Sequence, residues 1–152
     1  MNSRLKKSIP FSVATRAIIT LNLAVIGFHV LVLTQVIPYT IVWAGKLETE
    51  KEMYVFETLS ILINLILIAA VRAKTKAIKT NSSQTIINGV LWLFVIVFAL
   101  NTLGNLTART SIETYVATPL TFLLALLCWR VAIANHRTKK AQQRLAHIPA
   151  DE

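Results

Sequence analysis

Five polar side chains lie inside stretches of sequence that are otherwise apolar, and their types could together bind or protonate a small molecule. These side chains are His29, Glu57, Asn64, Asn101 and Thr121. Imidazole and carboxylate groups exchange protons and bind cations, while amides and hydroxyls donate and accept hydrogen bonds. Because a polar group in hydrocarbon costs free energy, such residues usually face the interior of a helix bundle. The sequence therefore predicts a ligand-binding site lined by these five residues.

Four apolar stretches carry these residues, and each has roughly the length of a membrane-spanning helix. They cover residues 17–37, 55–71, 86–106 and 115–134. A helix needs about 20 apolar residues to cross about 30 Å of hydrocarbon, so the second stretch lies at the short end of the range. Strands are excluded because the apolar residues are consecutive and do not alternate with polar ones. The sequence predicts an all-α, polytopic membrane protein, a four-transmembrane-helix bundle forming a single domain over residues 1–152.

The overall composition also indicates a membrane protein. Of the 152 residues, 55% are hydrophobic and 15% are charged, and the mean hydropathy is +0.60. About a quarter of the residues in a typical soluble domain are charged. An ordinary soluble domain is therefore excluded, and the chain is too apolar to be disordered.

The basic residues divide unequally between the two sides of the predicted bundle. Thirteen of the 16 Lys and Arg residues fall on the side that holds both termini and the connection between the second and third stretches. Only Lys46, Lys51 and Arg109 fall on the other side. By the positive-inside rule this asymmetry predicts that both termini are cytoplasmic, with residues 135–152 as a basic cytoplasmic tail. The expected location is the plasma (inner) membrane.

The placement of the cations also predicts their partners. They flank the apolar stretches, where anionic lipid headgroups attract them, so membrane lipids are expected partners. Clusters such as Arg137–Lys140 carry no interleaved aromatic residues for base stacking, so nucleic acid is not an expected partner. The interior Arg130 has no acid in its half of the membrane and is expected to extend to a lipid phosphate.

Helical spacing and depth favour a pocket that opens outward. Glu57 and Asn64 are seven residues apart, which places them on one helix face. At a rise of 1.5 Å per residue, His29, Glu57, Asn101 and Thr121 lie about 3 to 9 Å to the outer side of the estimated midplanes. The competing interpretation is that the amides and hydroxyls join helices by hydrogen bonds, while Glu57 reaches the outer headgroups.

Metal and cofactor chemistry find little support in the sequence. The other two histidines, His136 and His147, lie on the predicted cytoplasmic side, so no third strong ligand accompanies His29 and Glu57. Cys128 is the only cysteine, and glycine-rich phosphate loops are absent. The sequence therefore predicts no metal and no cofactor.

Three functions remain open. The first is binding of a small polar-headed or cationic molecule in the outward pocket, with transport as one use of such a site. The first alternative is an accessory or assembly subunit, in which the polar faces bind another membrane protein. The second alternative is an enzyme that acts on a lipid-soluble substrate, with His29 and Glu57 as acid and base. Expected partners are thus an unidentified small molecule and either a second copy of the chain or another membrane protein.

The connections between the stretches carry two further expectations. Residues 38–54 are predicted to lie along the outer surface, anchored there by aromatic residues that include Trp43. Residues 72–85 are predicted to form a cytoplasmic loop, in which Asn81, Ser82, Ser83 and Thr85 cap the third helix.

Overall fold

The computed structural model describes residues 9–108, 111 and 113–135, and all regular elements among them are helical. In chain order they are α2 (Phe11–Leu33), η1 (Tyr39–Ile41), η2 (Trp43–Gly45), α3 (Glu50–Thr80), α4 (Thr85–Leu106), η3 (Glu113–Ala117) and α5 (Thr118–Ala132). Four helical segments are long and apolar enough to cross a membrane: Phe11–Leu33, Glu50–Thr80, Thr85–Leu106 and Thr114–Ala132. The predicted all-α chain with four apolar helices is confirmed.

The α3 helix begins five residues before the predicted stretch 55–71, because Thr49 caps its first turn there. The N-cap residue Thr49 accepts a hydrogen bond at its side-chain oxygen from the backbone N–H of Glu52, at 3.2 Å. The Glu52 carboxylate in turn accepts one from the backbone N–H of Glu48, at 2.9 Å. Acidic residues in the first turn also interact favourably with the helix dipole.

The α3 helix also continues beyond residue 71, through most of the predicted loop. It ends at Asn81, whose left-handed backbone (φ 57°) allows the N–H of Ser82 to reach the carbonyl of Ala77 at 3.0 Å. The expected capping of α4 is not observed, since its N-cap residue is Gln84 and no side chain caps the helix. Asn81 therefore terminates α3 and does not start α4.

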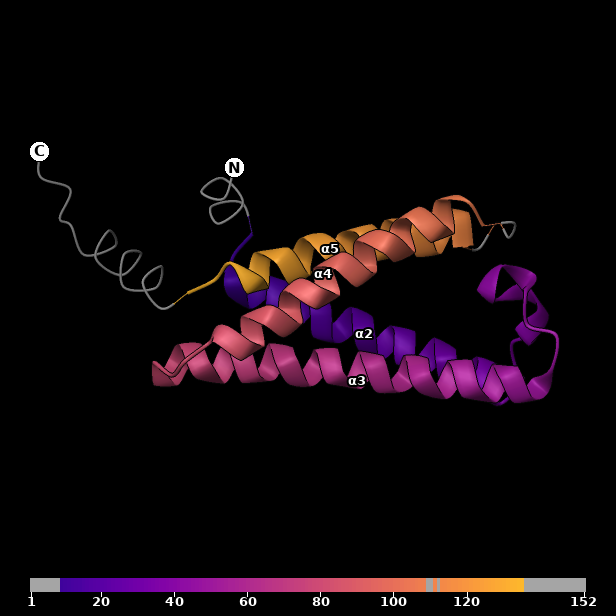
Figure 1. Ribbon diagram of the computed structural model, residues 1–152, viewed down its shortest axis with the longest axis horizontal. Coiled ribbons are helices and arrows are strands. Elements are labelled where there is room, and N and C mark those ends of the chain that lie inside the picture. The colour runs from indigo at the N-terminus through magenta and orange to yellow at the C-terminus, as the bar shows by residue number, and fades with distance from the viewer. Residues whose placement is uncertain (1–8, 109–110, 112, 136–152) are drawn as a thin grey trace, which may run out of the picture.

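The four long helices alternate in direction and form two pairs (Figure 1). α2 packs on α3 and α4 packs on α5, while α2 also contacts α5 and α3 contacts α4. One end of the molecule holds the start of α2, the end of α5 and the turn between α3 and α4, and we call it the core end. The opposite end holds η1 and η2, and we call it the η end. Towards the η end the α4–α5 pair diverges from the α2–α3 pair (Figure 1).

The buried apolar residues form two separate clusters. The main core lies towards the core end and is built by all four helices: Ala14, Ile18, Leu67, Val71, Leu91, Phe94, Phe98, Leu124, Ala125, Leu127, Cys128, Val131 and Ala132. A small cluster joins the end of α2 to the connection before α3: Val32, Val42, Leu47 and Met53. The segments of α2 and α3 between the two clusters have few buried apolar residues, and the buried Glu57 lies there.

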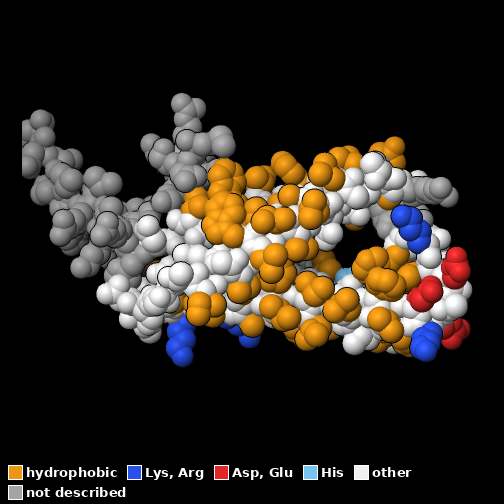
Figure 2. All heavy atoms as spheres, in the orientation of Figure 1, with side chains coloured by type: hydrophobic (Ala, Val, Ile, Leu, Met, Phe, Trp, Pro, Cys, Tyr) orange, Lys and Arg blue, Asp and Glu red, His pale blue; other side chains and the backbone are white. Residues whose placement is uncertain are grey.

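The molecular surface shows where this arrangement leaves space. Apolar side chains cover much of the middle of the bundle, and the acidic ones gather at the η end (Figure 2). The same view shows a hollow between the α4–α5 pair and the segment that contains η1 and η2. The exposed apolar side chains are those expected of a lipid-facing surface.

Candidate functional site

His29 and Glu57 form the centre of the candidate site. Nδ1 of His29, on α2, lies 2.5 Å from Oε2 of Glu57, on α3. The carboxylate is fully buried, at 0% residue exposure, whereas the His29 side chain is 15% exposed. The helical spacing alone left contact between these two residues open, and the packing of α2 on α3 brings them together.

Trp43 is the second donor to the carboxylate. Its indole Nε1–H donates a hydrogen bond to Oε1 of Glu57 at 2.8 Å, so each carboxylate oxygen has one partner. The indole also lies against Phe56, with the two ring centroids 5.0 Å apart. Trp43 was expected at the membrane surface, and its contact with Glu57 was not predicted from the sequence. The apolar Val42 beside it, which is buried in the small cluster, is the signal that this connection folds back onto the bundle.

The two donors explain how an acid can be buried at this position. An isolated buried carboxylate would be strongly destabilising, whereas hydrogen bonds to a charged group are among the strongest that proteins make. His29 uses Nδ1 for Glu57, and its other ring nitrogen, Nε2, makes no hydrogen bond with the described residues. The partial exposure of the His29 side chain leaves that nitrogen accessible to a ligand.

The Trp43 backbone is held in an unusual conformation. Its φ angle is 55°, in the left-handed region, and Gln35 (58°) and Gly45 (68°) are also left-handed in the same connection. This conformation suits glycine but costs other residues about 1–2 kcal/mol, and a bulky side chain adopts it rarely. The indole contacts with Glu57 and Phe56 therefore hold Trp43 in place.

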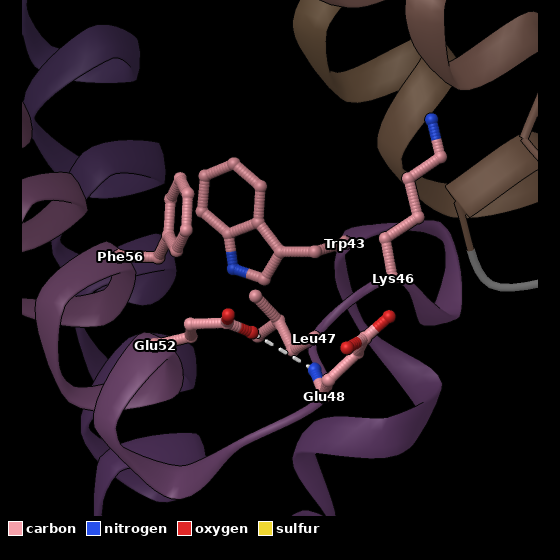
Figure 3. Close-up of a pocket in the computed structure, with 6 residues that line it drawn as sticks. All are labelled: Trp43, Lys46, Leu47, Glu48, Glu52 and Phe56. Carbon is pink, nitrogen blue, oxygen red and sulfur yellow. Dashed lines mark hydrogen bonds between the residues drawn. The ribbon is translucent and has the colours of Figure 1, made fainter.

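A pocket of about 500 Å³ lies on the exposed side of Trp43. It is lined by Trp43, Lys46, Leu47, Glu48, Glu52 and Phe56 (Figure 3). The Trp43 and Phe56 rings lie side by side and form an aromatic wall, and the two carboxylates come from the residues around the start of α3. The pocket thus combines aromatic faces with a net negative lining, a combination that suits organic cations.

Two asparagines continue the polar interface between α2 and α3. Asn22 lies seven residues before His29, and Asn64 lies seven after Glu57, so the antiparallel packing places both at a similar level. Asn22 is fully buried, and its Oδ1 has no hydrogen-bond partner among the described residues. The Asn64 side chain donates to the Ser60 carbonyl of its own helix, at 2.8 Å.

This polar interface closes towards the core end. Ile18, Leu67 and Val71 are all fully buried and belong to the main core. They follow Asn22 and Asn64 along α2 and α3 in the direction of the core end. The site is thus separated from that end by apolar packing.

The remaining predicted site residues lie elsewhere. Thr121 of α5 accepts hydrogen bonds from the side chains of Thr102 (3.0 Å) and Asn105 (3.4 Å), both on α4. Asn101 is exposed on α4 and makes no hydrogen bond with the described residues. Of the five predicted residues, only His29 and Glu57 are hydrogen-bonded to each other.

Two buried cations at the core end were not recognised from the sequence as buried. Lys74 is fully buried, and its ammonium group donates to Oε1 of Gln84 at 2.7 Å and to Oδ1 of Asn88 at 2.5 Å. Arg130 is 4% exposed and donates from Nε to the carbonyl of Ile9 at 2.8 Å. The expectation that Arg130 extends to a lipid phosphate is therefore wrong, because its side chain turns inward to join α5 to the start of α2.

Comparison of the chain with protein families, curated proteins and solved structures found no match. Within the part of the chain that the structure describes, no three His, Cys, Asp or Glu side chains come together as metal ligands would. The function is therefore inferred from the chemistry of the side chains themselves. A buried carboxylate beside an imidazole can bind a cation, hold a proton or pass one to a ligand.

Proposed function

We propose that this chain is a multi-pass membrane protein that binds a small polar-headed or cationic molecule at Glu57. The observation that supports this most is the buried carboxylate itself, which lies between His29 and Trp43 and next to an aromatic pocket. Burying a carboxylate this deeply costs free energy. Two neutral side chains could join α2 to α3 by a hydrogen bond at a lower cost. A binding role accounts for its presence.

We place the η end on the outer side of the plasma (inner) membrane, with both termini in the cytoplasm. The support is the distribution of charge in the sequence, with 13 cations on one side and three on the other. Acidic side chains gather at the η end, where Glu48, Glu50 and Glu52 surround the start of α3. The ligand would then reach the Trp43 pocket from outside.

Acid–base catalysis is the second candidate, and the free Nε2 of His29 supports it. A carboxylate that binds Nδ1 orients the ring and favours a proton-accepting Nε2, as a general base requires. The substrate would be a lipid-soluble molecule that enters the hollow between the α4–α5 pair and the segment that contains η1 and η2. Conversion of such a molecule by the purified protein would favour this alternative over simple binding.

The test begins with native mass spectrometry of the protein purified in a mild detergent. A retained small molecule supports a binding role, whereas a co-purifying membrane protein with no small molecule supports the accessory-subunit alternative. Calorimetry with an alkylammonium ion then compares Glu57→Gln with Glu50→Gln, an equal change of charge on an exposed residue. We expect at least a tenfold loss of affinity for Glu57→Gln alone, since a charged partner is removed. Equal affinities for both variants would contradict the proposal.

A further inference from the structure

The indole N–H of Trp43 is hydrogen-bonded to the carboxylate oxygen that a ligand at Glu57 would need. Oε2 is bound by His29 and Oε1 by the indole N–H, and no part of the Glu57 residue is exposed. A ligand can therefore reach the carboxylate only by displacing one of these donors. His29 belongs to a 23-residue helix, whereas Trp43 belongs to a connection with two three-residue helical turns. Trp43 is the donor that can move.

The backbone around Trp43 favours such a movement. Left-handed residues lie at both ends of the segment that carries the indole, Gln35 before it and Gly45 after it. Trp43 itself has a left-handed φ of 55°, which a bulky side chain rarely adopts without tertiary contacts. Because the bond to Glu57 is one of those contacts, loss of the bond removes a reason for the strained conformation. When the indole leaves Glu57, the relief of this backbone strain offsets part of the free energy lost with the hydrogen bond.

The pocket beside Trp43 indicates the chemistry of the ligand. One face of the indole lines it together with Phe56, and both rings are about two-fifths exposed, at 38% and 39%. The carboxylates of Glu48 and Glu52 outnumber the single ammonium of Lys46. Aromatic faces and carboxylates both attract organic ammonium ions. A cation held there lies against the indole whose N–H caps Glu57.

We infer that the Trp43 indole is the gate of the Glu57 site and that the ligand is an organic ammonium ion with at least one N–H. The ion binds first in the pocket beside Trp43 and Phe56, and its N–H then replaces the indole N–H at Oε1 of Glu57. This inference rests on the proposed function and adds the class of ligand and the residue that controls access. A quaternary ammonium ion can occupy the pocket, but it has no N–H to replace that of the indole.

The decisive variant is Trp43→Phe, which keeps an aromatic ring and removes the competing N–H. The probes are phenethylammonium and its N,N,N-trimethyl analogue, titrated by calorimetry. We expect Trp43→Phe to bind phenethylammonium about threefold to tenfold more tightly than the parent, since one hydrogen bond no longer has to be broken. Its affinity for the trimethyl analogue should not rise. The matched control is Trp92→Phe, at an exposed tryptophan of α4, which should bind both probes as the parent does.

The possible failures are distinguishable. If Trp43→Phe binds both probes as the parent does or more weakly, while Glu57→Gln still loses binding, the gate is refuted and the proposed function stands. If neither the parent nor Trp43→Phe binds either probe, the ammonium class is wrong and the cationic form of the proposed function fails with it.

A second measurement uses Trp43 as its own reporter. The chain has three tryptophans, so the double variant Trp92→Phe/Trp129→Phe leaves Trp43 as the only tryptophan, and excitation at the red edge of the indole band avoids the tyrosines. Saturating phenethylammonium should shift its emission to longer wavelength and increase quenching by acrylamide, because the indole leaves the buried carboxylate. The same titration in a Glu57→Gln background should produce no shift. An unchanged emission at saturating ligand in the Glu57 form would overturn the gate.

Discussion

His29 and Glu57 are 28 positions apart in the chain, yet Nδ1 of the imidazole lies 2.5 Å from Oε2 of the carboxylate. The contact depends on the packing of α2 against α3, because each residue comes from a different helix. It joins the two helices in the region between the main core and the small cluster, where few apolar residues are buried. The pair is therefore both a structural link and the centre of the proposed site.

We expect the effects of His29→Gln and Glu57→Gln on stability to be strongly coupled. Each single change leaves one polar partner of the pair behind and should lower the free energy of unfolding by about 1–3 kcal/mol. The double variant should lose less than the sum of the two, since groups in contact are not additive. Reversible unfolding in mixed micelles measures all four proteins. Additive losses would mean that the two side chains do not act together.

Thr121 should contribute to helix packing and not to ligand binding. Thr121→Val removes the hydroxyl that joins α5 to Thr102 and Asn105 of α4. Interhelical hydrogen bonds of this kind average about 0.6 kcal/mol, so we expect a small loss of stability and an unchanged ligand affinity. Asn101→Ala, at an exposed position, should change neither quantity. Loss of binding in Thr121→Val would instead place this residue in the site.

Lys74 provides a test of polar packing at the core end. Asn88→Leu leaves the buried ammonium group with Gln84 as its one remaining described acceptor, which should cost about 1–3 kcal/mol or more because the group is charged. Adding Lys74→Met removes the buried charge and should recover part of that loss. Thermal unfolding of the single and double variants measures the recovery. A double variant less stable than Asn88→Leu would rule out charge burial as the cause.

The proposed orientation can be tested by labelling engineered cysteines. In a Cys128→Ala background, a cysteine replacing Glu50 should react with an impermeant maleimide on intact cells. One replacing Lys76 should react only after permeabilisation. Both positions are exposed, so accessibility within the protein does not limit the reaction. The reverse pattern would place the η end in the cytoplasm and contradict the route of ligand entry.

The sequence was sufficient to predict the four helices, because long uninterrupted apolar stretches are a local property. Even the early start of α3 is encoded locally, in the N-cap Thr49, whose side chain accepts a hydrogen bond from the backbone N–H of Glu52. The end of α3 was harder to predict. Lysines and threonines continue the helix to Thr80. The helix ends there because the backbone of Asn81 is left-handed.

Which polar residues meet was decided by the tertiary structure. Periodicity places Asn101 on a helix face, but the rotation of α4 in the bundle determines that this face is exposed, while Thr121 turns towards α4. Trp43 reaches Glu57 only because the connection after α2 folds back through left-handed residues. A helix forms from contacts within a few residues, whereas register, rotation and loop path depend on how distant surfaces pack. The sequence therefore determined the helices and the candidate acid and base, and packing determined that His29 and Trp43 are both hydrogen-bonded to Glu57.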